Sequence, residues 1–295
     1  MIEGSWLRTT VNVNTMDKLI IGCGYLGRRI AKLWIAEGHQ VFATTRSESN
    51  ARELRQIGVE PVLCDVLNPQ SLIALPSAET VVHCIGLDRA SGRTMRDVYV
   101  RGLSNVLTRL PKPKRFLYVS STSVYGQTQG EEVDERAPTL PMEEAGKIAL
   151  EAERTLRGAL PDAVVLRFAG IYGPGRLLRR QTIEKGEPII GDPDKWLNLI
   201  QVEDGAAAVL AAEAHAQGGG VYNIADDCPV RRRDFYNNLA RVLGARQPTF
   251  VLPSPDAPLP SHERANRRIV NRRLHEELRM TLRYPSYEVG LPASV

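Results

Sequence analysis

The sequence predicts an α/β protein in which helices cover both faces of a doubly wound parallel sheet, with a smaller region at the C-terminal end. Short apolar runs are typical of buried strands, and they occur at 18–21, 40–44, 60–63, 80–85, 115–119 and 163–168. Stretches with helical character lie between most of them, at 25–37, 49–56, 96–110 and 142–159. Alternation of this kind predicts a parallel sheet. The run Thr80–Ile85 is apolar without alternation, as in strands buried on both faces.

Glycines and prolines interrupt the pattern after residue 170. The remaining elements that we expect are a strand at 197–202, an alanine-rich helix at 203–215, a strand at 221–225, a helix at 234–243, a loop at 251–261 and a last helix near 270–278. The main domain is therefore predicted to comprise 16–172 and 197–226, and the smaller region 173–196 and 227–295. Met16 directly precedes the first strand, so we expect residues 1–15 to be disordered or absent from the native protein.

The turn after the first strand carries three glycines in the spacing G-x-G-x-x-G, Gly22, Gly24 and Gly27. Such glycines permit the tight turn, let the backbone approach a pyrophosphate and let the helix pack on the strand. The amino end of the following helix then faces the phosphates. This pattern predicts a Rossmann-type dinucleotide site at Gly22, Cys23, Gly24, Tyr25, Leu26 and Gly27; the alternative is a βα turn without a ligand.

The residues at the end of the second strand indicate which dinucleotide the protein binds. An acidic residue there would bind the ribose 2′-hydroxyl of NAD, but Thr45 and Arg46 precede the first carboxylate, Glu48. Arg46 offers planar donors suited to a phosphate, which favours NADP(H) over NAD(H), unless Arg46 is only a solvated loop residue. Asp65, after the third strand, is placed to meet the adenine side or to cap the next helix.

Composition excludes several other classes of protein. The net charge of the 295 residues is +4, and the clusters Arg231–Arg233, Arg267–Arg268 and Arg272–Arg273 lack interleaved aromatics, so we interpret them as solvated helix faces rather than a nucleic-acid site. The four cysteines are far apart, which is typical of reduced thiols in a cytoplasmic protein. The five histidines show no metal-ligand spacing. No apolar stretch approaches the roughly 20 residues that span a bilayer, so we expect no membrane association.

Further motifs follow in order along the chain. They are Val81–Gly86, Val98–Val106, Val119–Gly126, Leu166–Pro174, Leu199–Asp204 and Val221–Ile224. With the glycine turn, they make the chain resemble the extended short-chain dehydrogenases/reductases, the NAD(P)-dependent epimerases and dehydratases that act on sugar nucleotides. The resemblance implies that the C-terminal region is a substrate cap, that Gly86 and Arg167 belong to the cofactor site, and that Arg176 begins the cap, where it could pair with a substrate phosphate or be exposed. It also implies a small-molecule substrate and a homodimer through 96–110 and 142–159.

The resemblance assigns the polarising hydroxyl to Ser121, with Thr122 as its neighbour. The proton-transfer pair of the family, Tyr-x-x-x-Lys, is absent. In the register without a gap its positions hold Ala145 and Ala149; a shifted register keeps Lys147 but offers no tyrosine. The family pair works because the lysine charge lowers the tyrosine pKa, so its loss requires another explanation.

Three interpretations remain open at this point. Another group could transfer the proton, the candidates being Tyr125, Lys147, Glu143, Glu144 and Tyr99, the last in place of the usual asparagine. Chemistry could need only hydride positioning and a water-mediated proton. The protein could also bind the dinucleotide without turnover. We therefore expect an NADP(H)-dependent oxidoreductase or epimerase/dehydratase-like enzyme acting on a small carbonyl, hydroxyl or sugar-type substrate, with a dinucleotide-binding regulatory protein as the alternative.

Overall fold

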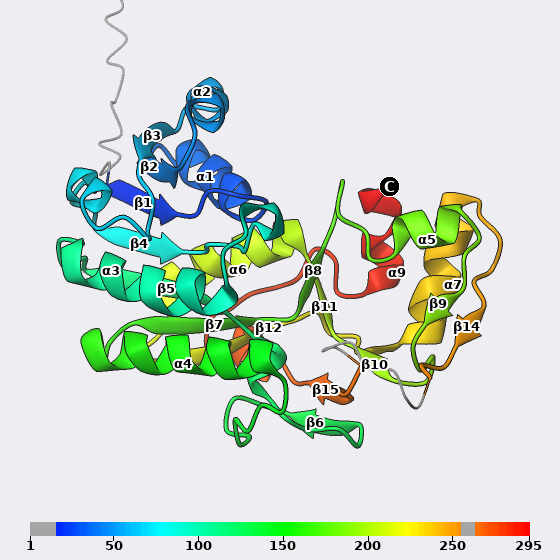
Figure 1. Cartoon of the computed structure of the whole chain (residues 1–295). Coiled ribbons are helices and arrows are strands. Elements are labelled where there is room, and N and C mark those ends of the chain that lie inside the picture. The colour runs from blue at the N-terminus through cyan, green and yellow to red at the C-terminus, as the bar shows by residue number, and fades with distance from the viewer. Residues whose placement is uncertain (1–15, 255–262) are drawn as a thin grey trace, which may run out of the picture.

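Seven parallel strands form the central sheet of the computed structural model, which describes residues 16–254 and 263–295 (Figure 1). Their order is β12-β7-β5-β4-β1-β2-β3. The strands are β1 (Asp17–Ile21), β2 (Gln40–Thr45), β3 (Glu60–Leu63), β4 (Thr80–His83), β5 (Arg115–Ser121), β7 (Val164–Phe168) and β12 (Val221–Ile224). From β1 the chain adds β2 and β3 on one side, and β4 then begins the strands on the other side. Ligands of such sheets bind at the carboxyl ends of the strands beside this switch in strand order. The expectation for residues 1–15, and part of that for the loop at 251–261, lie outside the described residues.

Helices cover both faces of this sheet. On one face lie α1 (Gly27–Ala36), α2 (Glu48–Gln56) and α6 (Val202–His215); on the other lie α3 (Gly102–Arg109) and α4 (Glu144–Ala159). Successive residues of a strand point to opposite faces, so Ile20 packs in the first core cluster whereas Leu19 and Ile21 pack in the second. The predicted doubly wound α/β fold is confirmed. The predicted helix 96–110 has a π-helical first part, Asp97–Arg101.

A smaller region with a core of its own follows the sheet (Figure 1). The parallel pair β8 (Gly170–Tyr172) and β11 (Leu199–Gln201) leads into it. Its other elements are α5 (Arg180–Glu184), β9 (Ile189–Ile190), β10 (Trp196–Leu197), β13 (Val230–Arg231), α7 (Arg232–Leu243), β14 (Phe250–Val251) and α9 (Tyr287–Gly290). Tyr172, Phe235 and Leu291 are fully buried in this core.

Part of the predicted cap lies on the sheet instead. β15 (Arg267–Ile269) pairs with β6 (Glu131–Val133), and α8 (Arg272–Glu276) packs beside β12. Leu274, Leu278, Met280 and Leu282 belong to the same core cluster as Trp34. These four apolar side chains need an apolar surface to cover them, and the open face at β12 supplies it. The segment around 267–282 thus departs from the predicted division, because that division followed chain order rather than packing.

Candidate functional site

A groove of about 790 Å³ runs along the carboxyl ends of β1, β2 and β4. We call it the glycine groove. Of the residues predicted to bind the cofactor, those that line it are Gly22, Cys23, Gly24, Tyr25, Leu26, Thr45, Arg46 and Gly86. The structure thus brings together most of the set chosen from the sequence, from three separate strand ends.

The three glycines of the turn have three different surroundings. Gly22 has a φ of +96°, and a Cβ built on it would lie 2.6 Å from Ile85 Cα. A Cβ on Gly27 would lie 2.9 Å from the Gly22 carbonyl oxygen, so this glycine permits close packing of α1. A Cβ on Gly24 would meet nothing within 4 Å, and it would project into space that a ligand can fill. These surroundings fit a diphosphate seated on the turn and the amino end of α1.

Hydrogen bonds hold this turn in place. The Gly22 amide donates to Thr44 Oγ1 at 3.0 Å, and the Cys84 thiol donates to the Gly22 carbonyl oxygen at 3.2 Å. The Tyr25 hydroxyl donates to the Pro174 carbonyl oxygen at 3.0 Å, which connects the turn to the chain that leaves β8. Burial raises the pKa of the Cys23 thiol to about 12, so a neutral group lies where phosphates would sit. The turn is therefore preorganised.

Two ion pairs close the outer end of the glycine groove. Arg46 Nη2 donates to Asp88 Oδ2 at 3.0 Å, and Arg93 Nη1 donates to Asp65 Oδ1 at 2.8 Å. The bond from Arg93 holds the pKa of Asp65 below its usual value. Arg46, Asp88 and Arg93 line the groove, whereas Asp65 itself is engaged beside it. Asp88 and Arg93 could not be found from the sequence, because they lie in a loop without a motif.

Arg167 has a position different from the one predicted for it. It is buried beneath the pockets, where its Nη2 donates to Glu153 Oε2 at 2.7 Å and its Nη1 donates to the Tyr125 hydroxyl at 3.0 Å. The Tyr125 hydroxyl donates in turn to Asn223 Oδ1 at 2.8 Å, and burial raises the tyrosine pKa. Arg167 does not line the glycine groove, and the Tyr125 hydroxyl is engaged by Arg167 and Asn223, although Tyr125 itself lines the inner pocket described next.

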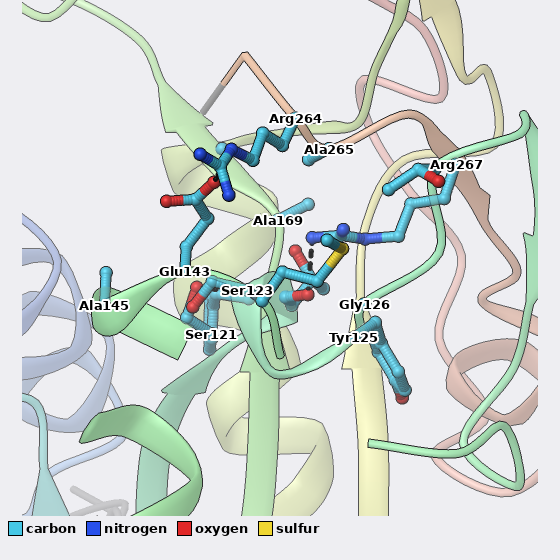
Figure 2. Close-up of a pocket in the computed structure, with 15 residues that line it drawn as sticks. Ser121, Ser123, Tyr125, Gly126, Glu143, Ala145, Ala169, Arg264, Ala265 and Arg267 are labelled. Carbon is cyan, nitrogen blue, oxygen red and sulfur yellow. Dashed lines mark hydrogen bonds and ion pairs between the residues drawn. The ribbon is translucent and has the colours of Figure 1, made fainter. Parts of the chain in front are cut away.

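A second cavity, of about 250 Å³, adjoins the end of β5 (Figure 2). This inner pocket is lined by Ser121, Thr122, Ser123, Tyr125, Gly126, Thr128, Met142, Glu143, Ala145, Phe168, Ala169, Gly170, Arg264, Ala265 and Arg267. Ser121 Oγ accepts a hydrogen bond from the Ser123 amide at 3.1 Å, so its own hydrogen can be donated to a ligand. The ring of Tyr125 points away from Ser121 in this view.

The start of α4 shows which side chains reach the inner pocket. Ala145 lines it, and Gly146 is required beside it because a Cβ there would lie 2.2 Å from the Ser123 carbonyl oxygen. Lys147 is exposed on the outer side of the helix. Glu143 lines the pocket and pairs with Arg264 Nε at 3.3 Å. Among the described residues that line this pocket, Glu143 is the one carboxylic acid.

The remaining candidates for proton transfer have other contacts. Glu144 is exposed and lies 3.5 Å from Arg96. The Tyr99 hydroxyl accepts a hydrogen bond from the Leu87 amide at 3.0 Å, close to the glycine groove rather than the inner pocket. The interpretation of Arg267 as part of a solvated helix face is wrong, because it lies on β15 with 8% of its surface exposed. Arg232 of another such cluster is also buried, paired with Glu263 at 2.6 Å.

Comparison with known proteins identifies the family. The sequence profile of the NAD dependent epimerase/dehydratase family matches residues 19–225. The chain belongs to this family. Protein YeeZ of Escherichia coli K12 is 30% identical over 242 residues, covering 78% of this chain and 85% of that protein. A 2-alkyl-3-oxoalkanoate reductase of Stenotrophomonas maltophilia is 28% identical over 249 residues, covering 76% of this chain and 74% of that protein.

Solved structures agree with the family assignment. A conserved protein of unknown function from Silicibacter pomeroyi is 29% identical with a TM-score of 0.77, covering 95% of this chain and 98% of that one. UDP-glucuronic acid 4-epimerase of Bacillus cereus, solved with NAD, is 18% identical with a TM-score of 0.75 over 95% and 97%, which shows the shared fold. The resemblance to extended short-chain dehydrogenases/reductases is thus confirmed. Within 16–254 and 263–295, no helix combines the length and apolarity needed to cross a membrane.

Proposed function

We propose that this member of the epimerase/dehydratase family is an NADP(H)-dependent oxidoreductase that interconverts a ketone and an alcohol in the inner pocket. One observation carries the proposal. Val119 lines the glycine groove and Ser121 lines the inner pocket. Both belong to β5, two positions apart, so they lie on the same side of the strand about 7 Å from one another. A dinucleotide in the groove would therefore bring its reactive end beside the Ser121 hydroxyl.

The chemistry follows from the side chains of the inner pocket. A nicotinamide bound in the groove supplies or accepts the hydride. The Ser121 hydroxyl donates a hydrogen bond to the substrate oxygen, which stabilises the negative charge that develops there during reduction. Glu143 stands in for the missing phenol: in the oxidation direction its carboxylate accepts the proton of the alcohol, and in reduction the protonated group returns it. The name of the Stenotrophomonas relative, a reductase of 3-oxoalkanoates, supports ketone reduction over epimerisation.

The preference for NADP(H) is supported by the end of β2. Thr45 and Arg46 occupy the positions where an acidic residue would select NAD. The guanidinium of Arg46 is already held at the groove by Asp88, 3.0 Å away. A 2′-phosphate would take the place of this carboxylate as the partner of Arg46.

The alternative is a protein that binds the dinucleotide and signals its presence without turnover. Ala145 favours this function, because it places a methyl group in the inner pocket at the position where the family resemblance expects the acid/base phenol. The proposed homodimer, through α3 and α4, would suit either function.

The deciding experiment measures NADPH oxidation over a panel of ketones together with the Kd of NADPH. Ser121→Ala is expected to lower kcat by roughly 10²-fold or more with little change in the Kd of NADPH. Glu143→Gln is expected to lower kcat and to change its pH profile. Ser104→Ala, an exposed serine of α3, is the matched control. Tight NADPH binding without turnover of any ketone would contradict the enzyme and support the regulatory protein.

A further inference from the structure

Arg267 lies where two cavities meet. It lines the inner pocket, and it also lines an outer pocket of about 810 Å³ that reaches into the smaller region. Of the residues that the structure describes, Thr122 and Ala265 also line both pockets. Figure 2 shows the guanidinium of Arg267 directed towards the side of the inner pocket on which Ser121 lies. A ligand that passes from one pocket to the other must therefore pass this cation.

Among the described residues, none forms an ion pair with Arg267; the carboxylate of exposed Glu131, its register partner on β6, acts on it only from a greater distance. Arg267 Nη2 donates to the Thr122 carbonyl oxygen at 2.8 Å, and its Nε is buried without a hydrogen-bond partner. No carboxylate of the described residues lies within the ion-pair distance of 4.0 Å. By contrast, the buried guanidiniums of Arg167 and Arg232 pair with Glu153 and Glu263 at 2.7 and 2.6 Å.

A buried cation without a counter-ion is costly, because an isolated charge loses its hydration. Burial lowers the pKa of Arg267 to about 10, so the group still carries its charge at neutral pH. An anion bound in the pocket would offset this loss and would also satisfy the Nε donor. The geometry of a guanidinium suits a carboxylate, which accepts two parallel hydrogen bonds.

The lining of the outer pocket indicates the chemical character of the rest of the ligand. Its wall carries apolar and aromatic side chains, Leu178, Ile189, Trp196, Leu197, Tyr236 and Phe250. Arg232 and Glu263, in the same wall, pair with each other. Arg89 and Arg179 lie at the wall too, but both are exposed, so solvent screens their charges. With one buried cation left to neutralise, the site fits a single negative charge and an uncharged body better than a diphosphate.

We infer that Arg267 is the receptor for a carboxylate on the substrate, and that the uncharged body of this substrate occupies the outer pocket. This inference rests on the proposed function for the reacting ketone, which Ser121 would polarise in the inner pocket. It defines the substrate class as keto or hydroxy acids with an apolar body. The carboxylate would act as an anchor that fixes the distance between the body and the reacting carbon.

Binding of simple probes tests the inference without turnover. Octanoate, octanamide and octyl phosphate are titrated into the full chain by calorimetry. Octanoate is expected to bind at least roughly tenfold more tightly than octanamide, since a charge-assisted bond is lost in the amide. Arg267→Met is expected to abolish this preference, and Arg267→Lys to keep part of it. Arg268→Met is the matched control, because Arg268 is the next residue of β15, is partly exposed and pairs with Glu132.

The outcomes separate the inference from the proposed function. An equal preference for octanoate in the wild type, in folded Arg267→Met and in Arg267→Lys would overturn the assignment of Arg267. Octyl phosphate binding more tightly than octanoate, with a larger loss in the Arg267 variants, would overturn the carboxylate in favour of a phosphate. Arg267-dependent binding of octanoate together with no reduction of any ketone would support the inference and contradict the oxidoreductase. Circular dichroism of each variant shows that the fold is retained.

Discussion

The glycine groove and the inner pocket open at the same edge of the sheet, but they are built in different ways. The groove depends mainly on backbone: residues 22–26 of one turn supply its floor, and strand ends and the loop after β4 supply its walls. The inner pocket is shaped by side chains from four segments, 121–128, 142–145, 168–170 and 264–267. A backbone-defined site requires particular glycines, whereas a side-chain-defined site allows its chemical groups to be exchanged.

The amino end of α4 illustrates how a chemical group can be exchanged. Gly146 must remain small because the Ser123 carbonyl oxygen lies against it, so the path of the helix is fixed. The neighbouring Ala145 faces a cavity and can change without moving the backbone. A change of side chain at position 145 is therefore compatible with an unaltered fold, and the two sites should respond differently to mutation.

The largest expected effect is a loss of stability from a substitution that distorts the glycine turn of the groove. Gly22→Ala forces alanine into a φ of +96° and places its Cβ 2.6 Å from Ile85 Cα. We expect a loss of about 2–6 kcal/mol in the free energy of unfolding, measured by urea denaturation. Gly24→Ala has nothing within 4 Å of its Cβ, so stability should stay the same while the Kd of the dinucleotide rises, since the methyl group occupies ligand space.

The pair of glycine variants also contains its own control. If Gly24→Ala lost as much stability as Gly22→Ala, the space over Gly24 would not be a ligand space. If it bound NADPH as tightly as the wild type, the diphosphate would lie elsewhere, and the placement of the dinucleotide on this turn would be wrong.

The sequence was sufficient for the sheet because apolar runs and glycine spacing are local signals. Each of the six apolar runs coincides with a strand of the sheet. The position of Arg167 could not be predicted in the same way: β7 is buried on both faces, so no alternation shows towards which side a residue points. Arg267 and Arg93 were missed for another reason, since neither residue belongs to one of the sequence motifs.

The next effect concerns the outer end of the groove. Arg46→Ala is expected to weaken NADPH by about 1.5–3 kcal/mol, the value of a charge-assisted hydrogen bond, and to leave NADH nearly unchanged. Asp88→Asn should have the opposite sign and a smaller size, because it removes the carboxylate that competes with the 2′-phosphate for Arg46. Fluorescence titrations at one ionic strength measure both. Equal losses of NADPH and NADH in Arg46→Ala would contradict the preference for NADP(H).

The smallest expected effect concerns the pH dependence of stability at Asp226. It tests whether a buried polar group without a hydrogen-bond partner always indicates a ligand. Asp226 follows β12, is 2% exposed, and has one carboxyl oxygen without a partner, as Arg267 has an unpartnered Nε. Unlike Arg267, it lines none of the three cavities described above. Burial, with a smaller contribution from Asp227 and Asp204, raises its pKa to about 8, so it is largely protonated at neutral pH. Protonation, rather than a bound ion, is how the fold accommodates this group.

The raised pKa of Asp226 determines whether stability rises or falls with pH. A folded pKa above the ordinary value of 3.8 means that the folded state holds the proton more tightly, so the stabilisation is lost as the pH rises from 3.8 through about 8. Between pH 7 and 9 the wild type should lose about 1 kcal/mol more than Asp226→Asn, measured by urea denaturation at each pH. Asp162→Asn, at an exposed carboxylate that does not contribute to the pKa of Asp226, is the control and should keep the wild-type slope. If Asp226→Asn kept that slope as well, the carboxyl would be ionised when folded. Its charge would then need a counter-ion, as we infer for Arg267.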